Sequence, residues 1–127
     1  MAFENIKLSQ KERDGLMKLK RTTGIKNWNT LCRWAFCVSL AEPSKPRKVK
    51  ITSDSSVEMK WKVFGGKHHD IYLALLTDRC KKDGESLDDE NLYQQFRFHL
   101  NRGINMLTLD KELKGADGLL KMALGVI

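Results

Sequence analysis

The stretch from Leu31 to Ala41 is an almost unbroken run of apolar residues, and it restricts the fold more than any other part of the sequence. Only Arg33 and Ser39 interrupt it, and its apolar residues recur at helical spacing. Gly24 breaks the helical pattern before the run, and Pro43 prevents a helix from continuing after it. A helix that is apolar over most of its surface is a buried helix. We therefore expect one central helix and assign five of its residues to the core or to an oligomer interface: Leu31, Trp34, Ala35, Phe36 and Val38.

The N-terminal part of the chain has the pattern of an arm, a helix, a turn and a second helix. Residues 3–8 alternate in part, which predicts a brief strand or an extended arm. Ser9 and Glu12 have the spacing of a capping box, so a helix should begin there. It should end near Gly24, because glycine adopts the left-handed conformation that follows many helices. Residues 1–42 form the basic arm-helix-turn-helix part of the chain, and within it residues 3–41 resemble a ribbon-helix-helix unit, whose dimer pairs two N-terminal strands.

The second part of the chain begins with a basic linker, residues 43–56, which is rich in proline, serine and cations. Apolar and polar residues then alternate from Val57 to Val63, which predicts a half-buried strand. Val49 and Ile51 would supply its partner in a short β-hairpin. Residues 57–127 would hold this strand and helices over 70–80, 88–103 and 105–113. The sequence predicts a mostly α fold with a small β component, arranged as one compact helical domain over residues 1–127.

Basic residues are concentrated in the first part of the chain. The net charge is +7; residues 1–50 hold 12 lysines and arginines against 4 acidic residues, whereas residues 51–127 hold 11 against 12. Polarised positive charge indicates a polyanionic partner, with nucleic acid first and an anionic membrane surface second. A solvated cationic face without a partner is the simplest alternative.

The turn between the two N-terminal helices is the strongest candidate for an anion site. Lys18, Lys20 and Arg21 close the first helix, and Lys26 lies just before the second. A helix N-terminus carries unpaired amides and the positive end of the helix dipole, so a phosphate can bind there. Contacts to phosphates do not depend on base sequence. The predicted DNA-binding residues are Lys18, Lys20, Arg21, Thr23, Gly24, Lys26, Arg33, Lys45, Arg47 and Lys48.

No sequence pattern indicates catalysis or a metal site. His68 and His69 are adjacent, and neighbours on a helix do not share a face. The Gly65-Gly66-Lys67 segment is only a fragment of a phosphate-binding loop. Cys32 and Cys37 lack the spacing of a metal or redox motif and are expected to be small core residues. We therefore expect a protein that is not an enzyme and that has no cofactor and no metal.

The expected compartment follows from cysteine usage and from hydropathy. Three cysteines, an odd number, do not suggest a disulfide framework. The N-terminus lacks a signal-peptide pattern, and no run of about 18 apolar residues occurs. We expect a cytoplasmic protein without a membrane partner.

Three segments carry a resemblance to a known family. They are Thr23-Gly24-Ile25-Lys26-Asn27-Trp28-Asn29, Leu31-Cys32-Arg33-Trp34-Ala35 and Ser39-Leu40-Ala41-Glu42-Pro43-Ser44. They resemble the DndE family of DNA phosphorothioation (DNA sulfur modification) proteins, and the Gly65-Gly66 turn and Gly118 agree with it. The resemblance implies a small helical accessory protein, a homotetramer that works beside enzymes replacing a non-bridging phosphate oxygen by sulfur. It also implies DNA binding at nicked duplexes, because sulfur insertion needs an opened and resealed backbone.

Residues and resemblance agree on a protein that binds a nucleic-acid backbone and has no catalytic centre of its own. The resemblance adds that it is a homo-oligomer on double-stranded DNA, including nicked DNA, beside other proteins of the sulfur modification machinery. The nearest alternative is a ribbon-helix-helix-type, sequence-specific transcriptional repressor that would read bases with Asn5 and Lys7. A nuclease or sulfur-transfer enzyme would need a metal or a reactive cysteine. A scaffold would use its cations on acidic protein surfaces.

Overall fold

The structure is a computed structural model that describes residues 4–109 of the chain. The longer helices are α1 (Gln10–Thr23), α2 (Trp28–Ala41), α4 (His69–Lys82) and α5 (Asp89–Leu109). Shorter elements are β1 (Asn5–Lys7), β2 (Glu58–Lys60), α3 (Trp61–Gly65) and the 3-10 helix η1 (Gly66–His68). The predicted mostly α fold with a small β component is confirmed.

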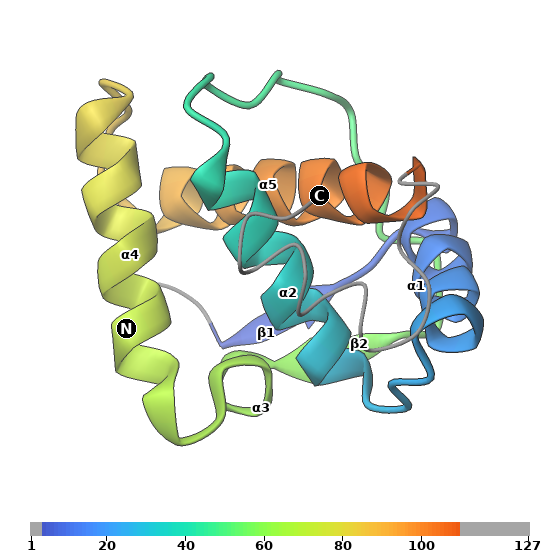
Figure 1. Cartoon of the computed structure of the whole chain (residues 1–127). Helices are drawn as coiled ribbons and strands as arrows, with labels where there is room; N and C mark the ends of the chain where they lie inside the picture. The colour runs from blue at the N-terminus through green and yellow to red at the C-terminus, as the bar shows by residue number, and fades with distance from the viewer. Residues whose placement is uncertain (1–3, 110–127) are drawn as a thin grey trace.

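The apolar helix α2 lies at the centre of the fold, as its sequence predicts. Figure 1 shows α2 crossing in front of α5, with α1 on one side and α4 on the other. The Phe36 ring on α2 lies 5.2 Å from the Phe96 ring on α5, measured between centroids. Trp61 and Phe64 of α3 pack on Phe96 at 5.2 and 5.0 Å. This aromatic cluster joins α2, α3 and α5 in one core.

Helix α1 begins and ends where local sequence signals predict. The Ser9 hydroxyl accepts from the Glu12 amide at 3.0 Å, and the Glu12 carboxylate accepts from the Ser9 amide at 2.8 Å. This reciprocal pair is the predicted capping box. At the other end, Gly24 has φ 76° and donates its N–H to the Lys20 carbonyl. Both helix ends are therefore set by residues close in sequence.

The small sheet differs from the predicted hairpin. β1 and β2 pair antiparallel with Ile6 opposite Met59, so the strands come from distant parts of the chain. Val49 and Ile51 do not form the partner strand. The predicted strand over residues 57–63 also ends at Lys60, where α3 begins. Trp61 and Phe64 are both buried, and their spacing of three residues suits a helical turn rather than a strand.

Gly103 does not end the last helix, contrary to the prediction from sequence. Helix α5 continues through Gly103 to Leu109, so the first part of the predicted stretch over 105–113 belongs to it and the rest lies outside the described residues. A Cβ at Gly103 would lie 1.7 Å from the Ala35 carbonyl oxygen. The glycine is there because the backbones of α2 and α5 approach each other closely, and not to terminate a helix.

Candidate nucleic-acid interface

The turn between α1 and α2 is held by its own hydrogen bonds. Thr23 is buried, and its hydroxyl donates to the Leu19 carbonyl at 2.6 Å and accepts from the Ile25 amide at 3.2 Å. Gly24 is exposed, and no atom lies within 4 Å of the position that a Cβ would occupy. Of these two predicted site residues, Thr23 therefore supports the turn, and Gly24 leaves its surface open.

The start of α2 has the features of an anion site. Asn27 stands at the N-cap position, but its side chain makes no capping hydrogen bond, and the first turn of α2 contains no acidic residue. The positive end of the helix dipole is thus not neutralised by the residues that usually do so. Lys20 and Arg21 lie in the last turn of α1, immediately across the turn.

The cations around this turn differ in their contacts. The Lys20 ammonium lies 4.8 Å from the centroid of the Trp28 ring, a cation–π contact. The Lys18 ammonium donates to the Thr108 carbonyl at 3.2 Å. Arg21 and Lys26 are exposed, and neither has a side-chain hydrogen bond or ion pair within residues 4–109. Arg21 and Lys26 are therefore the cations best placed to contact an external anion.

Arg33 contributes to the fold rather than to an open surface. It is half-buried, and its guanidinium donates to the Phe64 carbonyl at 3.1 Å and to the Thr30 hydroxyl at 3.2 Å. These bonds tie α2 to α3. The predicted assignment of Arg33 to the DNA-contacting set gains no support from this arrangement.

The predicted linker cations do not join the cations of the turn. Figure 1 shows the linker that follows α2 at the top of the molecule and the α1–α2 turn at the bottom. The 14 residues of α2 separate the two, a length of about 21 Å. Lys45 forms an ion pair with Glu85, whereas Arg47 and Lys48 are exposed. The structure thus divides the predicted set into two groups at opposite ends of α2.

Two cations that sequence reasoning left out lie on the segment that packs against the first turn of α2. The Asn29 amide donates to the Val63 carbonyl at 3.3 Å, which holds α3 against the first turn of α2. Lys62 and Lys67 of this neighbouring segment are exposed. Both lysines lie in residues 51–127, where basic and acidic residues nearly cancel. The charge of that part as a whole therefore does not reveal them.

The five residues assigned to the core or to an interface occupy two layers. Leu31, Ala35 and Phe36 are fully buried, whereas Trp34 and Val38 are half-buried and pack at the margin of the core. A surface hollow of about 270 Å³ lies beside this margin, lined by Thr30, Arg33, Trp34, Cys37 and Tyr72.

The thiols are not in the state that nucleophilic chemistry requires. Burial raises the pKa of Cys32 to about 12 and that of Cys80 to about 11. Cys37 is exposed on α2, which corrects the expectation of a core residue, and partial burial still raises its pKa. The thiolate is the reactive form, so none of the three is activated.

Neither a metal site nor a membrane span was found in the part of the chain that the structure describes. No group of three or more His, Cys, Asp or Glu side chains among residues 4–109 could hold a metal ion. None of the helices within the same residues is long and apolar enough to cross a membrane.

The fold is similar to crystal structures of DndE. The DndE from Escherichia coli B7A, involved in DNA phosphorothioation modification, has a TM-score of 0.71 and 23% identity, with 84% of this chain and 98% of that chain covered. A glycine-to-lysine mutant of DndE has a TM-score of 0.64 and 22% identity, with coverage of 82% and 95%.

Sequence comparison reaches the same family. None of the curated proteins matches the sequence significantly. The family model described as DNA sulphur modification protein DndE matches residues 5–115. Since that match covers most of the sequence, the chain belongs to the DndE family of DNA sulphur modification proteins.

Proposed function

We propose that this protein is a non-catalytic accessory component of the DNA phosphorothioation system that binds the duplex backbone at the α1–α2 turn. The observation that supports this most is the start of α2, which has neither a side-chain cap nor an acidic residue. Arg21 and Lys26 flank it with exposed charges, and Lys62 lies on the neighbouring segment. Amides and cations that converge on one point form a phosphate site.

Such a site reads the backbone rather than the bases. Each cation that neutralises a phosphate releases condensed counterions, so affinity falls as salt concentration rises. A nick leaves two backbone ends that can separate and enter a compact cluster of donors more easily than a continuous strand. We therefore propose a preference for nicked duplexes that does not depend on sequence.

The non-catalytic role is supported by the chemistry of the titratable groups. The raised pKa values of Cys32, Cys37 and Cys80 disfavour the thiolate that a sulfur-transfer step would require. The protein would instead hold DNA for other proteins of the sulfur modification machinery, which would supply the reaction.

We also propose a homo-oligomer, a tetramer, formed through the outer faces of α2 and α4. Ile71 and Leu75 lie one turn apart on α4 and are 56% and 43% exposed. Trp34 and Val38 form the partly covered margin of α2. Large apolar side chains that are exposed together often mark an interface. Ile71→Lys combined with Leu75→Lys should reduce the mass measured by light scattering, and an unchanged mass would place the interface elsewhere.

The repressor alternative has lost its main support. The order β1-α1-α2 agrees with a ribbon-helix-helix unit, but β1 pairs with β2 of the same chain. A repressor of that type pairs its N-terminal strand with that of a partner chain. We therefore do not propose base reading by Asn5 and Lys7.

Binding to intact and singly nicked duplexes of two unrelated sequences, at a series of salt concentrations, tests the proposal. Arg21→Ala/Lys26→Ala should weaken binding to all four duplexes and lower the log–log salt slope by about 2, near 0.9 for each lost phosphate contact. Lys7→Ala/Lys60→Ala, on the small sheet, removes the same charge and serves as the matched control. An equal loss in both variants would mean that general charge and not the turn determines binding.

A further inference from the structure

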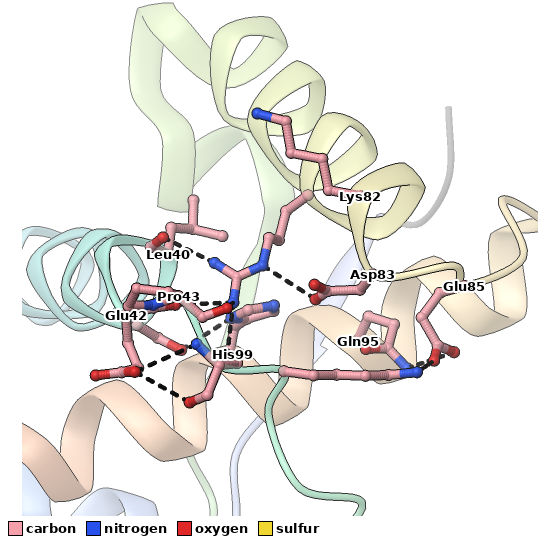
Figure 2. Close-up of polar contacts among 12 residues, drawn as sticks. Leu40, Glu42, Pro43, Lys82, Asp83, Glu85, Gln95 and His99 are labelled. Atoms are coloured by element: carbon pink, nitrogen blue, oxygen red, sulfur yellow. Dashed lines mark hydrogen bonds and ion pairs between the residues drawn. The ribbon is translucent and has the colours of Figure 1, made fainter.

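The linker between α2 and β2 is fixed at its start by two arginines. Arg79 of α4 contacts the carbonyl oxygens of Leu40, Glu42, Pro43 and Ser44 at 2.7 to 3.3 Å. Figure 2 shows the Leu40 and Glu42 segment on one side of this guanidinium and the Asp83 carboxylate, 3.0 Å from Arg79 Nε, on the other. Arg102 of α5 donates to the Ser39 and Ser44 carbonyls at 2.7 and 2.8 Å.

The next residues of the linker are also attached to the body of the protein. Lys45 forms an ion pair with Glu85, and this contact lowers the pKa of the Glu85 carboxyl. Glu85 is itself held by the Gln95 amide at 3.1 Å, and both residues lie together in Figure 2. Pro46 is buried. The Lys45 charge is therefore already paired with a carboxylate of the same chain, at the protein surface.

The far end of the linker is held as firmly. The buried Arg97 donates to the Thr52 carbonyl at 3.1 Å and contacts the Ser53 hydroxyl at 3.3 Å. The Asp54 carboxylate accepts from the Gln10 amide at 2.9 Å, and the Ser55 hydroxyl donates to the Leu8 carbonyl at 2.8 Å. The linker, whose composition is rich in proline, serine and cations, is thus anchored on both sides.

Between these anchors lie residues 47–50, which we name the linker crest. Arg47, Lys48, Val49 and Lys50 are all exposed. None of the three cations forms an ion pair with a carboxylate among residues 4–109. The positive charge of Lys48 is close enough to Glu85 to lower the pKa of the Glu85 carboxyl a little further. Anchoring before contact reduces the ordering cost when a partner binds. The crest is therefore a preorganised cationic surface.

We propose that the linker crest binds the phosphate backbone of a second DNA segment, separate from the segment at the α1–α2 turn. This rests on the proposed function, because it assumes that the turn binds DNA. The two cationic surfaces lie at opposite ends of α2 (Figure 1). Trp34, Cys37 and Val38 lie on α2 between them. Arg33 is the one charged residue of this helix, and its guanidinium is already bonded to the Phe64 carbonyl and the Thr30 hydroxyl. One molecule would then bring two DNA segments together.

A bridging experiment tests this inference. Two short duplexes with different fluorophores are mixed with the full chain, and energy transfer between them is compared with the affinity for one duplex. Arg47→Ala/Lys48→Ala should reduce bridging about tenfold, because simultaneous engagement is lost, but keep single-duplex affinity within about twofold. Lys7→Ala/Lys60→Ala should leave both readouts unchanged.

Four results would overturn the inference. Wild-type bridging by the Arg47→Ala/Lys48→Ala variant would show that bridging comes from several turns in an oligomer. A loss of single-duplex affinity as large as that of Arg21→Ala/Lys26→Ala would show one continuous surface. Binding without bridging in the wild-type protein would reject the second site and retain the proposed function, whereas absence of any DNA binding would reject both.

Discussion

Substitution of Gly103 by alanine is the most direct test of how α2 and α5 are packed. The new Cβ would lie 1.7 Å from the Ala35 carbonyl oxygen, 2.3 Å from its carbonyl carbon and 2.8 Å from its Cα. To reach ordinary van der Waals separation from that oxygen, the two backbones must move apart by about 1.7 Å. The obstacle is backbone, so no side-chain rotation can relieve it.

Gly103→Ala should lower the free energy of unfolding by a large amount, although helix propensity alone would raise it. In an exposed helix, alanine in place of glycine gains about 1 kcal/mol. Here overpacking should outweigh that gain and lower the free energy of unfolding by about 3 kcal/mol or more, since the shift separates the helices that carry Phe36 and Phe96. Total stabilities are about 5 to 15 kcal/mol, so this loss is a substantial fraction.

Urea denaturation followed by circular dichroism and tryptophan fluorescence measures the change. Gly15→Ala is the graded comparison, because its Cβ would meet a methyl group of Ile104 at 2.7 Å, and a side chain can move. Gly103→Ala should be much less stable than Gly15→Ala, and adding Ala35→Gly should not rescue it. A Gly103→Ala midpoint equal to or above that of the wild-type protein would refute the close approach of the two backbones.

Three further predictions concern charge, pH and the turn. Arg97→Met leaves the buried Glu12 carboxylate without the guanidinium group that lies 2.7 Å from it, and should lower the free energy of unfolding by about 3 to 5 kcal/mol. Adding Glu12→Gln should restore part of this loss. A loss below about 1 kcal/mol would contradict the buried ion pair. His99 has its pKa lowered to about 4 by burial and then by nearby arginine charge, so the unfolded chain binds more protons between about pH 6.5 and 4. Stability should therefore fall by about 2 to 3 kcal/mol as pH drops through that window, and urea midpoints of His99→Gln should show a smaller fall. Gly24→Ala should cost about 1 to 2 kcal/mol in thermal or urea unfolding, because φ is 76° although the space is open, and an unchanged stability would mean that the turn relaxes.

Local signals predicted the N-terminal half of the fold well. The capping box of Ser9 and Glu12 and the left-handed Gly24 lie within a few residues of the helix ends that they define. The apolar run from Leu31 predicted that α2 is central, because a helix that is apolar over most of its surface must be buried. These features depend on contacts within one or two helical turns, which sequence spacing describes directly.

Errors occurred where distant segments decide the structure. The partner of β2 is β1, and alternation in sequence could not distinguish β1 from residues 49–51. The sequence predicts a helix end at Gly103 because glycine disfavours helix interiors, whereas the close approach of Ala35 on another helix requires a glycine there. Alternation in sequence predicts a strand at Trp61, whereas in the structure Trp61 lies in α3 with Phe64 one helical turn further on. Each error has the same physical origin, a packing contact between residues far apart in the chain.

The candidate site shows the same division. The sequence by itself determined the net charge, the apolar central helix, the breaks around it and the resemblance that led to the family. Only the tertiary structure decided which cations lie together: it paired Lys45 with Glu85, used Arg33 to hold α3, and placed the linker and the α1–α2 turn at opposite ends of α2. Charge and periodicity are properties of a linear chain, whereas an electrostatic surface exists only after distant segments have packed.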